Sequence, residues 1–270
     1  MPALNQITYI GHATTLIELD GLRILTDPLL RERAFHLHRR SLPVNASRYQ
    51  DIDAILISHL HLDHCDIPSL RMLGREIHLI VPSGAADLFR KRGFTNITEM
   101  HVGETVKFGE LMIEATYAEH QSFFPPFGPS TESIGFLIKG SHNIYFPGDS
   151  DIFPGMTELA NNLDVALLPV WGWGPNLGPG HMNPERAAHA LTLLRPRIAI
   201  PIHWGTFYPR GLGWFRRQTL SEPPQLFYHY ASVLVPEIDI QILQPGSVFI
   251  FPVRKLEADH ISNRKQSPSP

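Results

Sequence analysis

The sequence predicts one layered domain in which α-helices cover mixed β-sheets. Segments typical of strands and helices alternate in both halves of the 270-residue chain, and β-hairpins are interleaved with them. Four separate predicted strands also end in residue types that bind metals. A chain of this length buries a substantial core, so we expect a single domain over residues 1–253 and a polar, disordered tail over residues 254–270.

The first half of the chain opens with hairpins. Asp20 and Gly21 lie between two runs of apolar residues, which is typical of a tight turn between antiparallel strands. Residues 29–50 are polar, basic and irregular, and a loop of that length in a compact domain is more often functional than not. Further along, Asp66 and Ser83 each precede a helix-like segment that they are suited to cap.

The second half of the chain repeats the alternation of strands and helices. Asn183 followed by Pro184 is typical of a helix N-terminus, and Pro236 stops the last predicted helix. The predicted helices cover residues 67–74, 83–92, 155–162, 184–194 and 224–234. The predicted strands cover residues 6–10, 14–19, 22–26, 54–57, 77–81, 106–108, 111–118, 134–138, 143–146, 165–169, 198–202, 239–243 and 247–252.

A run of metal-binding residue types follows the predicted strand at 54–57. The next residues read SHLHLDHCD and contain three imidazoles and two carboxylates. Folding does not require such a concentration, and it is costly unless a cation satisfies the groups. His59 and His61 share one side of an extended backbone, and Asp63 and His64 follow where the chain turns. Zn²⁺, Mn²⁺ and Fe²⁺ accept ligands of these types, so the segment indicates a metal site.

Three other predicted strands end in His120, Asp149 and His203. Sites gather in the loops at strand ends in layered folds. Taken alone, Asp149 is also typical of a turn residue, and His203 could stack on Trp204. Together with the histidine-rich segment, however, they favour one shared metal centre.

The fifteen histidines of the chain do not all belong to this centre. An isolated histidine is by default a surface residue or a satisfied core residue. We assign this role to His78, His101, His142, His189, His229 and His260. His36 and His38 lie in the basic loop, where a surface or substrate-rim position is expected.

These motifs resemble the metallo-β-lactamase superfamily. They are HLHLDH at 59–64, His120 after a strand, GDS at 148–150 and IHWGT at 202–206. The resemblance implies a four-layer αββα sandwich, the metallo-β-lactamase fold, with two metal ions at one edge. GHATTLIELDGLRILTDP at 11–28 is similar to the branch that contains the N-acyl phosphatidylethanolamine phospholipase D and the ascorbate-6-phosphate lactonase-like proteins.

The resemblance also implies seven ligands. One ion would be held by His59, His61 and His120, and the other by Asp63, His64 and His203, with Asp149 as the bridge. We expect two divalent transition-metal ions, zinc first, with manganese and iron as alternatives. Two such ions activate a water and stabilise negative charge on the reacting oxygen. Asp63 would also orient that water.

Further residues are expected around the ligands. We expect His12 to be a buried histidine beneath the site, bonded to a ligand or to backbone. His181, in a Gly-Pro-Gly-His loop before a helix, is either a proton donor to the leaving group or a helix-entry hydrogen bond. Trp171, Trp173 and Phe123 lie in Gly/Pro-rich loops and are expected to line an apolar substrate pocket.

The predicted function is a metal-dependent hydrolase of a phosphodiester, ester or lactone. The alternatives are a non-catalytic metal-binding scaffold and a diiron redox protein of the same fold. The net charge of −3 does not indicate a basic surface for nucleic acid. We expect no signal peptide and no membrane-spanning segment. We therefore expect a cytoplasmic protein with a small-molecule, partly apolar substrate, and a homo-oligomer remains open.

Overall fold

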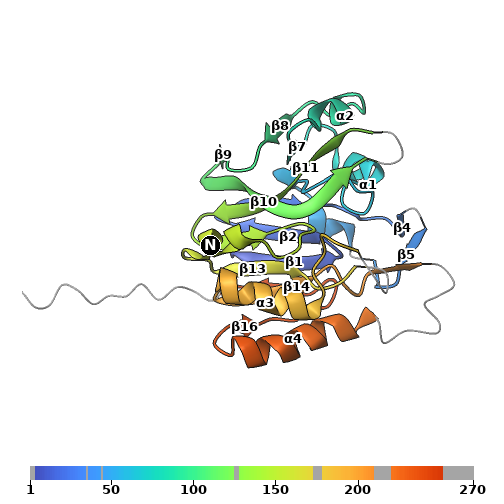
Figure 1. The fold of residues 1–270 in the computed structure, drawn as a ribbon. Helices are drawn as coiled ribbons and strands as arrows, with labels where there is room; N and C mark the ends of the chain where they lie inside the picture. The colour runs from blue at the N-terminus through green and yellow to red at the C-terminus, as the bar shows by residue number, and fades with distance from the viewer. Residues whose placement is uncertain are drawn as a thin grey trace, which may run out of the picture.

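The computed structural model describes residues 4–34, 36–43, 45–124, 128–172, 178–209 and 220–251. Two seven-stranded β-sheets pack face to face, and helices cover their outer faces (Figure 1). The expected four-layer sandwich is therefore confirmed. No helix among the described residues is long and apolar enough to cross a membrane. The predicted tail over residues 254–270 lies outside the described residues.

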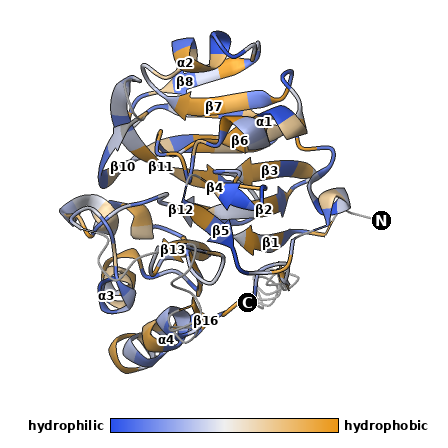
Figure 2. Ribbon diagram, turned by 90° about the vertical axis from the view of Figure 1, so that its right-hand side faces the viewer, coloured by the Kyte–Doolittle hydropathy of each residue, from blue (hydrophilic) through white to orange (hydrophobic). Residues whose placement is uncertain are grey.

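The first sheet joins antiparallel hairpins to a parallel half. Its order is β17 (Val248–Ile250), β1 (Gln6–Gly11), β2 (Thr14–Leu19), β3 (Leu22–Thr26), β6 (Ala54–Leu56), β7 (His78–Pro82) and β8 (Ile97–Met100). The strands from β3 to β8 run parallel. Strands of this kind are covered on both faces and therefore carry unbroken apolar runs, and Figure 2 shows hydrophobic residues along β6 and β7.

The second sheet is built in the same way. Its order is β16 (Asp239–Ile240), β14 (Ile198–Ile202), β13 (Val165–Pro169), β12 (Asn143–Phe146), β11 (Ser130–Lys139), β10 (Leu111–Phe123) and β9 (Thr105–Phe108). Here β12, β13, β14 and β16 are parallel, whereas β9 to β12 form antiparallel pairs. A small third sheet contains β15 (Phe207–Pro209), β5 (Leu37–Arg39) and β4 (Arg33–Ala34).

The helices divide between the two sheets. The α-helices are α1 (Ile67–Leu73), α2 (Ala86–Arg90), α3 (Pro184–Leu194) and α4 (Glu222–Leu234). In Figure 1, α1 and α2 lie beside β7 and β8, and α3 and α4 lie beneath β13 and β14. The larger hydrophobic core fills the space between the sheets and reaches α3, while a second core packs α1 and α2 on the first sheet.

Two predicted helices differ in the structure. The second begins at Ala86 rather than at Ser83, because the carboxylate of Glu99 on β8 accepts from the backbone N–H of Ala86 and replaces a local cap. The helix predicted at 155–162 is instead a 3-10 helix over Pro154–Ala160.

The strand predictions also need corrections. The 29–50 segment, expected to be irregular, contains β4, β5 and a 3-10 turn over Ala46–Tyr49. Strands β8 and β15 have no counterpart in the sequence-based prediction. Strand β10 continues to Phe123 through a register shift between Tyr117 and Gln121, so it runs beyond its predicted end.

Candidate metal centre

The histidine-rich segment folds into a tight turn at the end of β6. The backbone N–H groups of His64 and Cys65 both donate to the carbonyl of His61, at 3.0 and 2.7 Å. This turn brings Asp63 and His64 back beside His59. The parallel strands β6, β12 and β14 end just before the histidine-rich segment, Asp149 and His203, so residues far apart in the chain converge here.

Three imidazoles form the first group. Nδ1 of His61 lies 3.1 Å from Nε2 of His59 and 3.1 Å from Nε2 of His120. His120 reaches them because the register shift in β10 redirects the strand, and Glu119 pairs instead with Asp151. Three nitrogens at these separations match the donor spacing around one tetrahedral cation.

The second group joins four residues. Nε2 of His64 lies 3.0 Å from Nε2 of His203, and Nε2 of His12 lies 3.0 Å from Oδ2 of Asp63. The ligand atoms of all four side chains lie within 4.8 Å of one another. The histidine predicted to lie beneath the site therefore adjoins the second set, in direct contact with Asp63.

Asp149 contacts the second group and lies close to the first. Its Oδ2 is 3.2 Å from Nε2 of His64, and its Oδ1 is 3.2 Å from Nε2 of His203. A carboxylate oxygen of Asp149 also lies within 4.8 Å of a ring nitrogen of His120, in the first group. Glycine at position 148 is needed for this approach, because a Cβ there would come within 2.4 Å of Cβ of Ser58. Asp149 is only 4% exposed, and its Oδ1 has no hydrogen-bond partner. A buried carboxylate oxygen in that position is costly unless a cation satisfies it.

In two of the imidazoles, a hydrogen bond from Nδ1 to backbone determines that Nε2 carries the lone pair. Nδ1 of His120 donates to the carbonyl of Gly180 at 2.9 Å, and Nδ1 of His203 donates to the carbonyl of Trp171 at 2.7 Å. A carbonyl only accepts, so the proton of each neutral ring is on Nδ1 and the lone pair is on Nε2. Nε2 of His203 faces Oδ1 of Asp149 at 3.2 Å, and Nε2 of His120 lies 3.1 Å from Nδ1 of His61, which is the arrangement of a metal-ligand set.

The comparisons with known proteins agree with this geometry. Residues 22–204 match the β-lactamase superfamily domain. The chain belongs to the β-lactamase superfamily. A metal-dependent hydrolase of Rubrobacter xylanophilus is 30% identical, over 90% of this chain and 95% of its own length.

Two further similarities concern a phospholipase and a solved structure. An N-acyl-phosphatidylethanolamine-hydrolyzing phospholipase D 1 of Caenorhabditis elegans is 29% identical over 76% of this chain and 64% of its own length. A metallo hydrolase from Ignicoccus hospitalis has the same fold, with a TM-score of 0.72 and 22% identity over 93% of this chain and 99% of its own.

One residue at the centre, Asp27, was not predicted from the sequence. Asp27 is fully buried after β3, and its Oδ2 accepts from Nδ1 of His64 at 2.8 Å and from the Ser58 hydroxyl at 2.5 Å. Because that hydroxyl proton is committed to Asp27, Nδ1 of His59 must donate to Ser58 Oγ, at 3.0 Å. Asp27 therefore orients one histidine of each group. Its position at a strand end was the available signal.

Asp27→Asn is expected to lower metal affinity or activity about 10- to 100-fold, as is typical of groups that orient metal ligands. Asp27 accepts three donors from Ser58 and His64, and an amide NH₂ would face one of those donors. Metal titration followed by calorimetry would measure the loss. Asp53→Asn, at an exposed carboxylate that accepts only from the Arg23 backbone, is the matched control. Equal affinity in both variants would contradict this role.

His181 and the predicted aromatic residues have different environments. Nε2 of His181 lies 3.3 Å from Oδ2 of Asp149, and its ring centroid lies 4.7 Å from that of His120, so it borders both groups. Trp171 is 9% exposed, stacks on Tyr208 and offers its carbonyl to His203. Trp173 lies outside the described residues, and so does the side chain of Phe123.

Electrostatics give the imidazoles different protonation states. Burial lowers the pKa of His61 to about 4 and that of His203 to about 3, so both are neutral at pH 7. Burial alone would also lower the pKa of His64, but the carboxylates of Asp149 and Asp63 raise it well above its usual range. Burial alone would raise the pKa of Asp149, but the imidazoles of His203, His64 and His181 together hold it well below its usual range. The centre therefore combines neutral His61 and His203 with an ionised Asp149 and a protonated His64, and a bound cation would replace that proton.

Chelator-treated protein is expected to lose stability as the pH falls from about 6.5 toward 4. The pKa of His61 is lower in the folded state than its ordinary value of 6.5, so the unfolded chain binds the extra proton over this window. Thermal unfolding of His61→Gln should therefore depend less on pH than that of the wild type. His189→Gln, at an exposed position on α3, should retain the wild-type dependence. The same pH dependence of thermal unfolding in all three proteins would contradict the lowered pKa of His61.

Proposed function

We propose that this protein is a hydrolase whose centre holds two divalent transition-metal ions, zinc first, with manganese or iron as alternatives. The observation that carries the proposal is the carboxylate of Asp149, buried beside His64 and His203 and within 4.8 Å of a ring nitrogen of His120. One of its oxygens has no hydrogen-bond partner among the described residues. The superfamily membership and the hydrolase named among its relatives support the same class of reaction.

The donor set fits two ions. Nitrogens of His59, His61 and His120 would hold the first, and side chains of Asp63, His64 and His203 the second. Asp149, which lies beside His64 and His203 and near His120, would serve both. When bound, such a pair lowers the pKa of a water toward about 7 and stabilises negative charge on a phosphoryl or carbonyl oxygen.

The chain's own residues would complete the site. The buried imidazole of His12 holds Asp63 at 3.0 Å, which fixes the direction of its carboxylate toward an attacking water. The side chain of His181 is 19% exposed, so one edge faces incoming substrate while Nε2 stays near Asp149. We assign His181 to proton transfer toward the leaving group, because an imidazole at the rim of the centre can deliver a proton there.

The substrate class we propose is a small molecule with a phosphodiester, ester or lactone and an apolar part. An apolar cavity of about 280 Å³ adjoins the ligand-bearing turn, and its lining includes Leu62, Cys65 and Phe124. Leu62 and Cys65 flank the proposed ligands Asp63 and His64, and Phe124 comes directly after the end of β10, the strand that carries His120. The phospholipase among the relatives supports a phosphodiester as the first candidate.

A substrate panel tests this function. Metal-replete protein should hydrolyse at least one of a phosphodiester, a carboxylic ester and a lactone, and chelation should remove the activity until zinc, manganese or iron is restored. A protein that retains its metals but hydrolyses no class would support a metal-binding scaffold instead. Given the net charge of −3, we also propose that nucleic acid is not the substrate. The cytoplasmic location stays a prediction from the sequence.

A further inference from the structure

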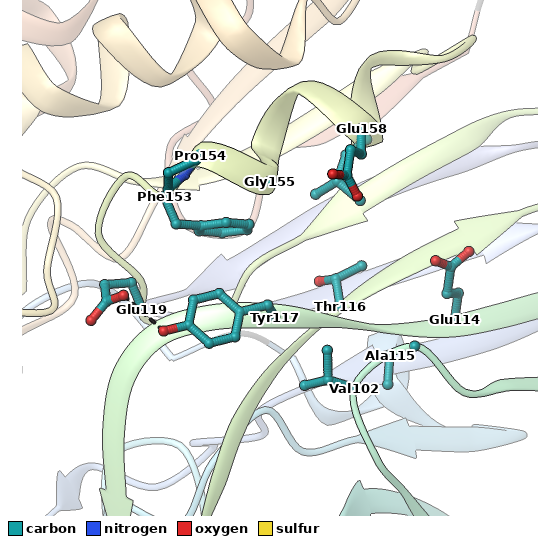
Figure 3. Close-up of a pocket in the computed structure, with 12 residues that line it drawn as sticks. Val102, Glu114, Ala115, Thr116, Tyr117, Glu119, Phe153, Pro154, Gly155 and Glu158 are labelled. Carbon is teal, nitrogen blue, oxygen red and sulfur yellow. Dashed lines mark hydrogen bonds between the residues drawn. The ribbon is translucent and has the colours of Figure 1, made fainter.

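A cavity of about 500 Å³ lies between β10 and the 3-10 helix Pro154–Ala160 (Figure 3). Strand β10 supplies one wall and the helix, together with Phe153 before it, supplies the other. None of the described residues that line it belongs to the proposed ligand set. This cavity therefore contains none of the proposed metal ligands, and the proposed hydrolysis does not use it.

Two aromatic rings lie at one end of the cavity. The centroids of Tyr117 and Phe153 are 5.0 Å apart, and the rings are nearly perpendicular at 79°. Tyr117 is 45% exposed, so part of its ring remains open to a ligand. Figure 3 shows both rings beside Glu119. An aromatic face next to a carboxylate is a typical environment for an organic cation.

The charge around the cavity is negative. Glu114 is compensated by Nζ of Lys139 at 2.6 Å. Glu119 accepts a hydrogen bond from the Tyr117 hydroxyl at 2.8 Å, which leaves its charge intact. Glu158 has no ion pair with any described residue, and no Lys or Arg is among the described residues that line the cavity. Two uncompensated carboxylates therefore face this space.

A buried hydroxyl lies beneath the rings. Thr116 is 5% exposed, and its Oγ1 is covered, with the buried Tyr145 hydroxyl as its neighbour. On the other side, a Cβ at Gly135 would come within 2.6 Å of this oxygen. Figure 3 shows Thr116 on the side of β10 that faces Phe153 and Glu158. Thr116 therefore forms part of the cavity floor, and the aromatic rings and carboxylates are the groups that a ligand would contact.

We propose that this cavity binds an organic ammonium ion, a cationic nitrogen that carries apolar substituents. The charge is attracted by Glu119 and Glu158, and the substituents pack on Tyr117 and Phe153. A divalent metal fits less well, because none of these glutamates belongs to a described group whose ligand atoms lie within 4.8 Å of one another.

Calorimetry with choline and its neutral isostere 3,3-dimethylbutan-1-ol tests the proposal on the metal-loaded full chain. Choline should bind roughly 2- to 30-fold more tightly than the isostere, which corresponds to the ~0.5–2 kcal/mol of a cation–π contact. The preference should weaken with added salt, because exposed charges are screened. Equal binding of the two compounds, or no binding of choline, would overturn the proposal.

Two variants locate the binding site. Tyr117→Leu keeps apolar volume but removes the aromatic face, and Glu158→Gln removes one charge at an exposed position. Each should weaken choline binding several-fold while metal content and circular dichroism stay at wild-type levels. Glu110→Gln, the same change at the exposed β9–β10 turn, should bind choline normally. Unchanged binding in both cavity variants would assign choline to another place and refute this site.

Discussion

Asp149→Ala is expected to abolish hydrolysis and to reduce bound metal below that of the wild type. Asp149 lies 3.2 Å from His64 and His203 and within 4.8 Å of a ring nitrogen of His120, so the substitution removes the carboxylate that both proposed sites would share. Two cations would then face each other with less screening. The loss should exceed the roughly 10- to 100-fold typical of groups that only orient ligands.

Elemental analysis and steady-state kinetics would measure the two effects of Asp149→Ala together. Asp87→Ala is the matched control, because its side chain is 77% exposed and pairs only with Arg90 on the same helix. That variant should keep both metal and activity. An Asp149→Ala protein with wild-type metal content and full activity would remove Asp149 from the centre.

His181→Ala is expected to slow hydrolysis in a way that depends on the leaving group. A poor alkoxide leaving group needs a proton, so its hydrolysis should fall by about 10²- to 10⁴-fold, as is typical of general acid catalysis. A nitrophenolate leaves without a proton and should be affected much less. Metal content should remain at the wild-type level, because Nε2 of His181 lies beside Asp149 at 3.3 Å but outside both predicted ligand groups.

Comparing the substrates with alkoxide and nitrophenolate leaving groups distinguishes the roles proposed for His181. Burial alone would lower the pKa of His181, but the Asp149 carboxylate and the Pro179 carbonyl together raise it above its ordinary value, as a proton donor requires. Equal losses on both substrates would assign His181 to substrate positioning. A loss of metal would instead move it into the ligand set, beside His120 and Asp149.

Local signals in the sequence predicted the elements that depend on local contacts. The Asp66 carboxylate accepts from the backbone N–H of Ser69, and Asn183 accepts from that of Arg186, so both predicted caps are confirmed. The start of α2 was wrong because its cap comes from Glu99, on a strand that follows the helix. Strand β5 was missed because its partner β15 lies far along the chain.

The same distinction applies to the candidate centre. The spacing of His59, His61, Asp63 and His64 is a local signal, and the structure brings these residues together. The role of Asp27 depends on β3 and β6 being parallel neighbours, which places its carboxylate against Ser58 and His64. The spacing of residues along the sequence does not reveal this contact, because it arises only from the pairing of β3 with β6.

Metal content per chain tests the central claim most directly. Protein expressed with ample metal, or reconstituted with zinc, should contain close to two ions per chain by elemental analysis, because the imidazoles and carboxylates divide into two groups that share Asp149. Asp149→Ala should hold fewer. One ion or less per wild-type chain, with no increase on reconstitution, would contradict the two-metal centre.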